Sequence, residues 1–476
     1  MKIAMIASEA APYIKTGGLG DVMQALPAEL SKIRGNEVCL FLPYYKRIKQ
    51  NESIAVEFVG SFSMDLSWRE SYVGIFRLKS RRKKLQIYFI DNDYYFGARG
   101  TVYGDFDDGE RFAYFSKAVM AAIYHLDFKP DVLHCHDWQA AMSIIYCKAL
   151  YRNWSPNTKT VFTIHNVEYQ GWAEASFFQN TLGLPEEYLG HLTYDGAINM
   201  MKGAIEVSDI VTTVSKTYAQ ELCYPYYAHR LDGFLRNCWL WGITNGIDTG
   251  VFDPATDGAL AVNYSAKDML GKWENKLALR KELGLRTDTD APILAMVTRL
   301  AGHKGIDLLC YIAGQLMERE VQLVIVGTGE KQYEYVLSAL AHQYPGKVAV
   351  RLAFDPALAS RVYAGADMYL MPSKSEPCGL SQLIAMRYGT VPIVAATGGL
   401  RDTVMPYNPE TKEGRGFTFQ SYNADDFLGA IDRAVNLYYE HRSQWNALAK
   451  ADMECDFSWK KPAEEYMQLY RELLSK

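Results

Sequence analysis

The sequence predicts an α/β protein of two similar doubly wound domains, each a parallel sheet with helices on both faces. Strand-like and helix-like segments alternate along both halves of the chain, as is typical of parallel sheets covered by helices. A length of 476 residues is too great for one hydrophobic core and fits two domains of about 200 to 250 residues each. A glycine-rich pattern, TGGLxD, occurs once in each half, at 16–21 and 397–402.

The first half contains a regular series of expected strands and helices. The expected strands are 2–8, 37–43, 72–78, 85–90, 131–138, 160–165, 210–215 and 239–244, and the clearest helices are 21–33 and 110–125. A polar, aromatic loop is expected from 91 to 105. The basic run at 81–84 lies between two of the strands and is interpreted as a solvated hairpin turn rather than an anion-binding patch.

The regular alternation stops near residues 245–248, which a polar stretch with proline and glycine follows at 253–258. We therefore expect one domain over 1–245 and a second over 246–458. Strands of the second domain are expected at 293–300, 322–327, 348–354, 368–372 and 391–396, with helices such as 305–319 and 331–342. The tail, 459–476, contains a final helix, and we expect removal of residues 461–476 to leave the core of each domain largely intact.

Composition is that of an ordinary globular protein, with 49% hydrophobic and 22% charged residues. A formal net charge of −5 with mixed signs argues against nucleic acid as a partner. The eight cysteines are scattered without a CxxC pair, which favours a reducing compartment. No apolar run approaches the roughly 20 residues that span a bilayer, so no membrane association is expected. We expect a cytoplasmic protein, or a plastid stromal protein whose leader was removed.

The two glycine patterns each follow an expected strand and open an expected helix. Paired glycines allow a sharp turn and a close approach of backbone to ligand, and they leave free N–H groups at a positive helix end. Two such loops in equivalent places predict two halves that offer glycine loops to a shared cleft. The alternative is that both are only tight turns between strand and helix.

Charged residues follow two expected strands of the second half. Arg299 and Lys304 come after strand 293–300, and the carboxyl ends of parallel strands are where doubly wound folds bind ligands. Two cations at that edge suit a pyrophosphate leaving group, although they could be solvated surface cations. Glu376 follows strand 368–372, and its carboxylate could hold a sugar hydroxyl or simply cap a helix. Cys378, near the expected helix start, is predicted to be exposed and reactive.

Histidines end two expected strands of the first half. His134 and His136 lie on one face of a strand and Cys135 on the other, so the three form no compact metal site. His165 and Asn166 end strand 160–165 and are better placed to lie against a sugar ring. A purely structural histidine at position 165 is the alternative.

Taken together, these residues resemble the motifs of bacterial glycogen synthases and plant starch synthases, which are retaining glucosyltransferases of the GT-B fold. The matching segments are KTGGL at 15–19, HDW at 136–138, HN at 165–166 with YQG at 169–171, NGID at 245–248, RL at 299–300 with KG at 304–305, EPCGL at 376–380 and TGGL at 397–400. They occur in order along the chain, and the combination of KTGGL with EPCGL is highly specific.

The resemblance implies two Rossmann-like domains facing a central cleft, with the acceptor on the side of 1–245 and the nucleotide-sugar donor on the side of 246–458. The helix in 459–476 would cross back to the first domain. The implied reaction transfers glucose from ADP-glucose to the non-reducing end of an α-1,4-glucan with retention of configuration, and it needs no metal or other cofactor. The implied catalytic residues are Lys15, Asp137, His165, Arg299, Lys304 and Glu376. The implied donor-binding residues are Lys15, Gly17, Gly18, Asp21, Tyr95, Asn166, Asn245, Arg299, Lys304, Phe354, Glu376, Cys378, Gly379, Leu380 and Thr397.

Some positions depart from the family pattern. Phe354 falls where the family tends to place an aromatic residue against adenine, here without a hydroxyl. The second acid of a paired-glutamate motif is absent, because Ile384 stands eight residues after Glu376. Phe252-Asp253 and His229-Arg230 replace the usual residues on the acceptor side that the resemblance implies, which leaves the preferred chain length open.

Three other classes of protein fit less well. A glucan phosphorylase would need a lysine for pyridoxal phosphate near the second glycine loop, and 397–403 contains none. An NAD-dependent oxidoreductase would need GxGxxG after the first strand, which 17–20 does not supply. An inactive glucan-binding protein would not need the intact set of charged site residues. The sequence leaves open the product, the choice between ADP- and UDP-glucose, regulation, and whether the chain forms a homo-oligomer.

Overall fold

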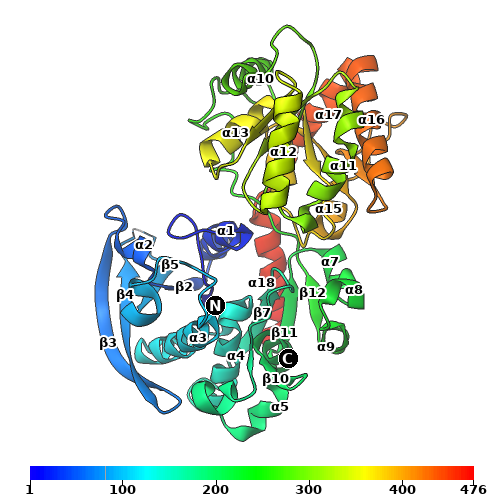
Figure 1. The fold of residues 1–476 in the computed structure, drawn as a ribbon. Coiled ribbons are helices and arrows are strands. Elements are labelled where there is room, and N and C mark those ends of the chain that lie inside the picture. Colours follow the sequence, from blue (N-terminus) through cyan, green and yellow to red (C-terminus); the bar gives the residue numbers. More distant parts are fainter. Residues whose placement is uncertain (81) are drawn as a thin grey trace. The chain divides into compact units, whose positions relative to one another are not determined.

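The computed structural model describes residues 1–80 and 82–476, and the chain forms two compact units. Unit 1 comprises residues 1–245 together with 459–476, and unit 2 comprises residues 246–458. The end of the chain therefore belongs to the same unit as its beginning, as the red and blue segments of Figure 1 show. Arg81, the first residue of the basic run, lies outside the described residues.

Unit 1 is built on a nine-stranded sheet in which seven strands are parallel and the last two, β4 and β3, are antiparallel. In spatial order the strands are β12 (Leu240–Gly242), β11 (Ile210–Thr213), β7 (Lys159–Ile164), β6 (Val132–His136), β1 (Lys2–Ile6), β2 (Glu37–Pro43), β5 (Leu85–Asp91), β4 (Arg69–Leu78) and β3 (Val56–Leu66). The strand predictions for this half are confirmed, and antiparallel pairing of β4 with β5 confirms the hairpin between them. Strand β3 was not predicted, because an edge strand with much of its length exposed carries a weak hydrophobic pattern.

A small three-stranded sheet completes the strands of unit 1. It contains β8 (Trp172–Glu174), β10 (Ala197–Asn199) and β9 (Thr193–Tyr194). The longer helices of the unit are α1 (Gly18–Lys32), α3 (Asp108–His125), α4 (Trp138–Leu150), α6 (Met200–Val207) and α18 (Lys460–Leu474), and α7 (Lys216–Glu221) is shorter. Shorter helical segments are α2 (Lys46–Lys49), η1 (Asp93–Gly97), η2 (Phe178–Leu182), η3 (Glu186–Tyr188), α5 (Leu189–Leu192), α8 (Pro225–Ala228) and α9 (Asp232–Asn237).

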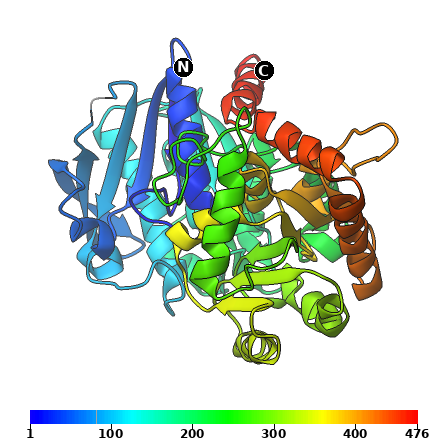
Figure 2. The ribbon, with the colours of Figure 1, turned by 90° about the horizontal axis from the view of Figure 1, so that it is seen from above.

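Helix α18 is an integral part of unit 1. Its apolar face is buried, including Tyr466, Leu469 and Tyr470, and Figures 1 and 2 both show it beside α1. The Tyr470 hydroxyl lies 2.7 Å from Nδ1 of His134 in the central strand β6. The expectation that residues 461–476 could be removed without damage to a core is therefore wrong for unit 1, because removal would expose these apolar side chains.

Unit 2 is built on six parallel strands in the order β15, β14, β13, β16, β17, β18. Their bounds are β13 (Ile293–Val297), β14 (Gln322–Val326), β15 (Val348–Arg351), β16 (Met368–Met371), β17 (Val391–Ala395) and β18 (Phe417–Phe419). Numbered from β13, this is the order 3-2-1-4-5-6 of a Rossmann fold. The predicted doubly wound α/β class is thus confirmed. Two apolar clusters, one on each face of this sheet, form the core.

Helices cover both faces of the sheet in unit 2. They are α10 (Leu270–Leu283), α11 (Ile306–Met317), α12 (Lys331–Gln343), α13 (Pro356–Gly365), α14 (Ser381–Arg387), α15 (Gly398–Thr403), α16 (Ala424–Glu440) and α17 (Arg442–Glu454), with a 3-10 turn η4 (Gly302–Lys304). Helices α1 and α15 each begin within the glycine pattern, earlier than predicted. The prediction of a helix running onward from Asp402 is wrong, because α15 ends at Thr403, shortly before Pro406.

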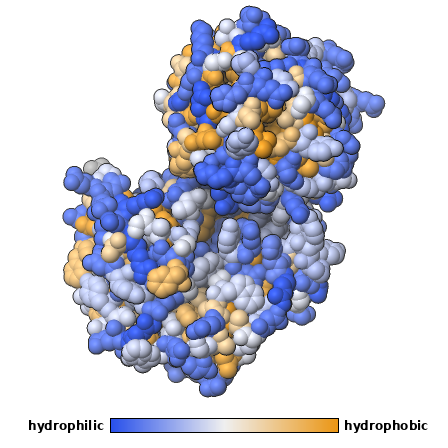
Figure 3. Space-filling model, viewed as in Figure 1, coloured by the Kyte–Doolittle hydropathy of each residue, from blue (hydrophilic) through white to orange (hydrophobic). Residues whose placement is uncertain are grey.

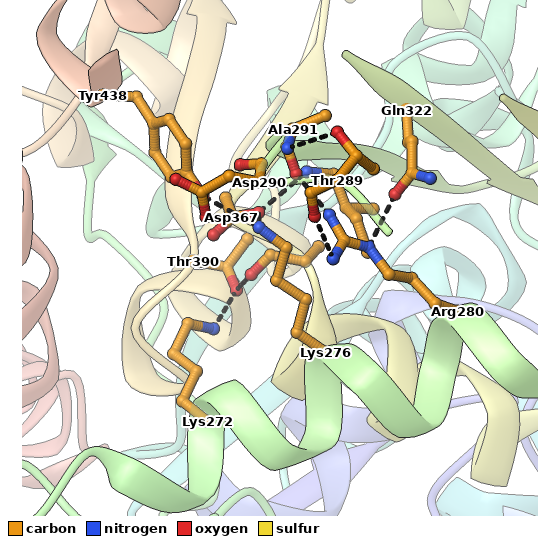
Figure 4. Close-up of polar contacts among 12 residues, drawn as sticks. Lys272, Lys276, Arg280, Thr289, Asp290, Ala291, Gln322, Asp367, Thr390 and Tyr438 are labelled. Carbon is orange, nitrogen blue, oxygen red and sulfur yellow. Dashed lines mark hydrogen bonds and ion pairs between the residues drawn. The ribbon is translucent and has the colours of Figure 1, made fainter. Parts of the chain in front are cut away.

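Three cations of α10, of which Lys276 and Arg280 are buried, close the amino-terminal edge of this sheet (Figure 4). Lys272, Lys276 and Arg280 are spaced four residues apart and so share one face of the helix. Nζ of Lys272 donates to the Ala364 and Tyr388 carbonyls, at 3.1 and 2.9 Å. Those carbonyls lie at the ends of α13 and α14, where a positive charge is favourable. Lys276 pairs with Asp367 at 2.8 Å, and Arg280 donates to the Ala291 carbonyl at 2.7 Å.

The face of the molecule in Figure 3 is mostly hydrophilic, with scattered hydrophobic residues on both units. Singly exposed aromatic side chains such as Trp68 and Phe106 are normal on a protein surface. Among residues 1–80 and 82–476, no helix has the length and apolar character needed to cross a membrane.

Removing the Lys272 ammonium should destabilise unit 2. In Lys272→Met the Ala364 carbonyl loses its donor, whereas the Tyr388 carbonyl keeps the Tyr264 hydroxyl at 2.7 Å; a buried acceptor without a partner costs about 1 to 3 kcal/mol. We expect the free energy of unfolding of unit 2 to fall by about 3 kcal/mol, measured by calorimetry or by denaturant titration. Lys281→Met, at an exposed position of the same helix, is the control and should change little. Equal transition midpoints for both variants would contradict the role assigned to Lys272.

Candidate active site

Strand topology gives each unit one edge suited to ligand binding. In unit 2, β13 lies between β14 and β16, so the loops that follow β13 and β16 run to opposite faces of the sheet. This is the switch point at which doubly wound folds bind ligands. Residues 298–305 follow β13 and residues 372–380 follow β16, and both segments carry predicted site residues. In unit 1 the equivalent point lies between β1 and β6.

Lys304 and Glu376 meet at the switch point of unit 2. Nζ of Lys304 lies 2.7 Å from Oε2 of Glu376, and the Ser373 hydroxyl donates to the same oxygen at 3.0 Å. Glu376 is buried, whereas the Lys304 side chain is partly exposed. A charged pair held by a third group in a partly buried place is pre-organised to act on a polar ligand.

Glycines allow the surrounding loops to approach closely. Gly305 has a φ of 75°, and a Cβ there would lie 2.0 Å from the Pro372 carbonyl oxygen. Gly399 donates its N–H to the Glu376 carbonyl at 3.0 Å, and a Cβ on it would lie 2.2 Å from the carbonyl oxygen of Cys378. The second glycine pattern thus packs directly on the segment that carries Glu376.

Cys378 does not match the prediction of an exposed, reactive thiol. Its residue is buried, with 5% of its surface exposed, because the glycine loop containing Gly399 covers its backbone. Thr397, which precedes α15, is likewise buried. Gly379 has a φ of 73°, a conformation that favours glycine. Leu380 is partly exposed and lies, like Gly379, in the wall of the neighbouring cavity.

That cavity lies within unit 2 at the switch point. Its wall comes from the ends of β13 and β16 and from the loops that follow them, and includes Thr298, Lys304, Ser373, Glu376, Gly379 and Leu380. Four of the residues predicted for this half, Lys304, Glu376, Gly379 and Leu380, therefore line one hollow at the carboxyl edge of the sheet.

Arg299 and Phe354 lie on the exposed part of the same edge. Arg299 is exposed and forms no ion pair with another described residue. Phe354 follows β15, and 81% of its surface is exposed. A guanidinium without a partner suits an anion, and an open aromatic face suits a flat heterocycle.

Glu9 binds backbone N–H groups of the first glycine loop, which were predicted to be free for a ligand. Its carboxylate accepts the backbone N–H of Thr16, a second bond from the Thr16 hydroxyl, and the N–H of Gly17 at 3.3 Å. Burial raises the pKa of Glu9, partly offset by these hydrogen bonds. The prediction that these amides are free is therefore wrong. Sequence reasoning missed Glu9, although an acid just after a buried strand and before a glycine loop was a usable signal.

Lys15 and Asp21 form an ion pair beside this loop. The Lys15 Nζ lies 2.7 Å from Oδ1 of Asp21, and both side chains are partly exposed. A Cβ at Gly20 would lie 2.9 Å from Cγ of Lys15, so this glycine leaves room for the lysine stem. Asp21 thus orients the Lys15 ammonium. Gly17 and Gly18 lie at the start of α1, where backbone N–H groups and the helix end carry positive charge.

Asp137 holds the loop that follows β7. Its Oδ1 accepts the backbone N–H of His165 at 2.7 Å and of Asn166 at 3.4 Å. Asp137 itself has a φ of 58°, which is unfavourable for a residue with a side chain and is common at functional sites. Burial raises the pKa of Asp137 to about 7, while the two N–H groups lower it.

Three histidines near Asp137 lie in β6 or directly after β7. The rings of His134 and His136 lie 4.1 Å apart, and Nδ1 of His136 lies 3.0 Å from Nε2 of His165. Burial lowers the pKa of His134 and of His165 to about 3, and that of His136 well below its usual range. All three rings are therefore neutral. No group of three or more His, Cys, Asp or Glu side chains suited to a metal ion occurs in the described part of the chain.

Two other predicted donor-binding residues have less open surroundings. Tyr95 is buried, stacks on Tyr114, and donates its hydroxyl hydrogen to Glu110 at 2.7 Å, so its contacts are those of a core residue. Asn245 is buried at the end of unit 1, and its Oδ1 has no hydrogen-bond partner among the described residues. Asn166 is partly exposed beside His165.

Comparison with known proteins covers the whole chain. Residues 2–237 match the family model described as starch synthase catalytic domain, and residues 279–452 match glycosyl transferases group 1. Glycogen synthases of Desulforamulus reducens and Bacillus anthracis are each 45% identical, over 100% of this chain and 99% and 100% of theirs. The catalytic domain of starch synthase IV from Arabidopsis thaliana, bound to ADP and acarbose, superposes with a TM-score of 0.91 at 35% identity, covering 100% of this chain and 99% of that one.

Two parallel-sheet units, each with polar groups gathered at its carboxyl edge, define a glycosyltransferase of the GT-B fold. The sequence similarity extends over both units, so it identifies a family as well as a fold. The chain belongs to the glycogen and starch synthase family.

Glu9→Gln should loosen the first glycine loop. The amide keeps one acceptor oxygen but loses the charge and places N–H₂ where an acceptor is needed; a hydrogen bond to a charged group is worth about 1.5 to 3 kcal/mol. We expect the amides of Thr16 and Gly17 to exchange hydrogen at least about tenfold faster, measured by mass spectrometry. Glu29→Gln, on the partly exposed side of α1, is the control. Unchanged exchange in Glu9→Gln would show that the carboxylate does not hold the loop.

The raised pKa of Asp137 makes its contribution to stability depend on pH. A folded pKa of about 7, above the ordinary 3.8, means that the native state binds more protons than the unfolded chain between these values. Stability is therefore lost as pH rises from about 4 to about 7, on the order of 4 kcal/mol in total. Asp137→Asn cannot ionise at this position, so its melting temperature should rise relative to that of the wild type as the pH increases from about 4 to about 7. A difference between the two melting curves that stays constant from pH 4 to 8 would contradict the assignment.

Proposed function

We propose that the protein transfers glucose from ADP-glucose to the non-reducing end of an α-1,4-glucan, with retention of configuration and release of ADP. Membership of the glycogen and starch synthase family supports glucosyl transfer in glycogen or starch synthesis. The structural neighbour bound to ADP and acarbose supports an adenine nucleotide donor and a glucan acceptor.

The pair formed by Lys304 and Glu376 carries this proposal. Negative charge grows on the bridging oxygen as the bond between glucose and diphosphate breaks. The partly exposed Lys304 ammonium, with Arg299 five residues earlier, supplies positive charge for that oxygen. Glu376 orients the ammonium at 2.7 Å and offers its remaining acceptor sites to sugar hydroxyls. The cationic side chains thereby neutralise the leaving diphosphate, and we propose that transfer needs no metal ion.

Other residues of unit 2 position the donor. The exposed Phe354 ring offers a stacking surface for adenine, and its lack of a hydroxyl leaves the ring contact apolar. Gly379 and Leu380 lie in the wall of the same cavity as Glu376. Cys378 and Thr397 are buried and support this wall.

Unit 1 supplies polar groups for the glucosyl group and its phosphates. Lys15, oriented by Asp21, and the backbone N–H of Gly18 at the start of α1 would contact phosphate oxygens, whereas the N–H of Gly17 is bound to Glu9. Asp137 holds His165 and Asn166, which would face the sugar.

An assay of nucleotide release tests the function directly. The enzyme is incubated with glycogen and either ADP-glucose or UDP-glucose, and the nucleotide and the anomeric configuration of the product are measured. We expect ADP release and an α-1,4-linked product. Release of UDP alone would reject the proposed donor, and release that does not require glycogen would reject transfer to a glucan.

Lys304→Gln tests the charge at the leaving group. Because the ammonium stabilises charge that develops only in the transition state, we expect kcat to fall about a hundredfold, or roughly 3 kcal/mol, with a small change in donor KM. Lys450→Gln, a substitution of an exposed lysine on α17, should leave both parameters unchanged. A raised KM with normal kcat in Lys304→Gln would mean that the lysine only anchors the donor.

A further inference from the structure

The hydrogen bond between His136 and His165 can exist in only two forms. Both rings are neutral, so a single hydrogen lies between Nδ1 of His136 and Nε2 of His165, 3.0 Å apart. Either His136 donates from Nδ1 and His165 carries its own hydrogen on Nδ1, or His165 donates from Nε2 and His136 carries its hydrogen on Nε2. The two forms present opposite groups to a ligand, because Nδ1 of His165 is a donor in the first and an acceptor in the second.

The surroundings of His136 distinguish these forms. Its Nε2 is buried and has no hydrogen-bond partner among the described residues. In the second form that atom would carry an N–H without an acceptor, and buried N–H groups without a partner are rare in proteins. In the first form the atom is a bare nitrogen, and the second hydrogen lies on Nδ1 of His165, which is not among the buried side-chain atoms without a partner in the described part of the chain. The first form is therefore the better satisfied one.

His134 and the residues bonded to it hold the His136 ring in place. The His134 ring packs against it at a tilt of 34°, with ring centroids 4.1 Å apart. His134 is fixed at both nitrogens, by the Tyr470 hydroxyl at 2.7 Å and the Thr163 hydroxyl at 2.5 Å. Tyr470 belongs to α18, so this helix supports the His134 ring, and through it the His136 ring, from the side away from His165.

We propose that His136 is a positioning residue that fixes His165 in the tautomer with hydrogen on Nδ1, so that His165 serves as a hydrogen-bond donor to the sugar. This inference rests on the proposed function in one respect, that His165 faces the glucosyl group. It gives His165 a defined role: a neutral donor to a sugar oxygen, with its Nε2 lone pair occupied by His136 and unavailable as a base.

Two substitutions of equal shape test the role of His136. Asn places a side-chain N–H close to the position of Nδ1, whereas Leu has the same branching without a donor. Both remove most of the ring and disturb the packing against His134 to a similar extent. His136→Asn should therefore retain the tautomer of His165, and His136→Leu should lose it.

The tautomer is read from ¹⁵N spectra of histidine-labelled enzyme without ligand, with the His165 signals identified by their loss in His165→Asn. In the wild type and in His136→Asn we expect a protonated Nδ1 and a bare Nε2. In His136→Leu we expect a protonated Nε2 or a mixture of tautomers. A protonated Nε2 of His165 in the wild type, or an unchanged tautomer in His136→Leu, would overturn the proposal.

Kinetics provide the second measurement. We expect kcat to fall by roughly tenfold to a hundredfold in His136→Leu and to be largely restored in His136→Asn, with similar melting temperatures for the two variants. Equal losses of kcat in both would show that only packing matters and would reject the donor role. The spectra do not depend on turnover, so a failure of the proposed transfer reaction is distinguishable from a failure of this inference.

Discussion

A backbone carbonyl, that of Pro372, occupies the position at which a side chain of residue 305 would begin. The glycine at 305 is what allows the loop after β13 to touch the loop after β16, and this contact brings Lys304 within 2.7 Å of Glu376. The same device recurs where Gly399 meets the backbone of Cys378. The polar edge of unit 2 therefore depends on backbone approaching backbone, which no other residue type would permit at these two positions.

Unit 1 orders its corresponding edge with buried carboxylates. Glu9 accepts N–H groups of the first glycine loop, and Asp137 accepts those of His165 and Asn166. A carboxylate is a strong acceptor for backbone N–H groups, so each acid fixes a loop that would otherwise have no regular partner. Burial raises the pKa of both acids. How well ordered these loops are therefore depends on whether the two acids are ionised.

Much of the fold could be predicted from the sequence, since the parallel strands of both units are short buried runs separated by amphipathic helices. The weakly patterned edge strand β3 could not, and neither could the helix bounds at the glycine loops. Lys304 and Glu376 could be identified because each follows a buried strand. That these two side chains pair with each other was not predictable. Tyr95 was assigned to the donor, although its ring and hydroxyl make their contacts within the core.

The sequence by itself determined most strands of the two large sheets, where glycines interrupt the chain, and which family motifs occur. These properties are local, because they depend on periodicity and on residues near one another in the chain. Only the tertiary structure decided that Glu9 fills the glycine loop, that Cys378 is buried, and that Tyr470 braces the histidines of β6. Those results depend on contacts between residues that folding brings together: Tyr470 and His134 are separated by 336 positions, and a local pattern carries no information about such a pair.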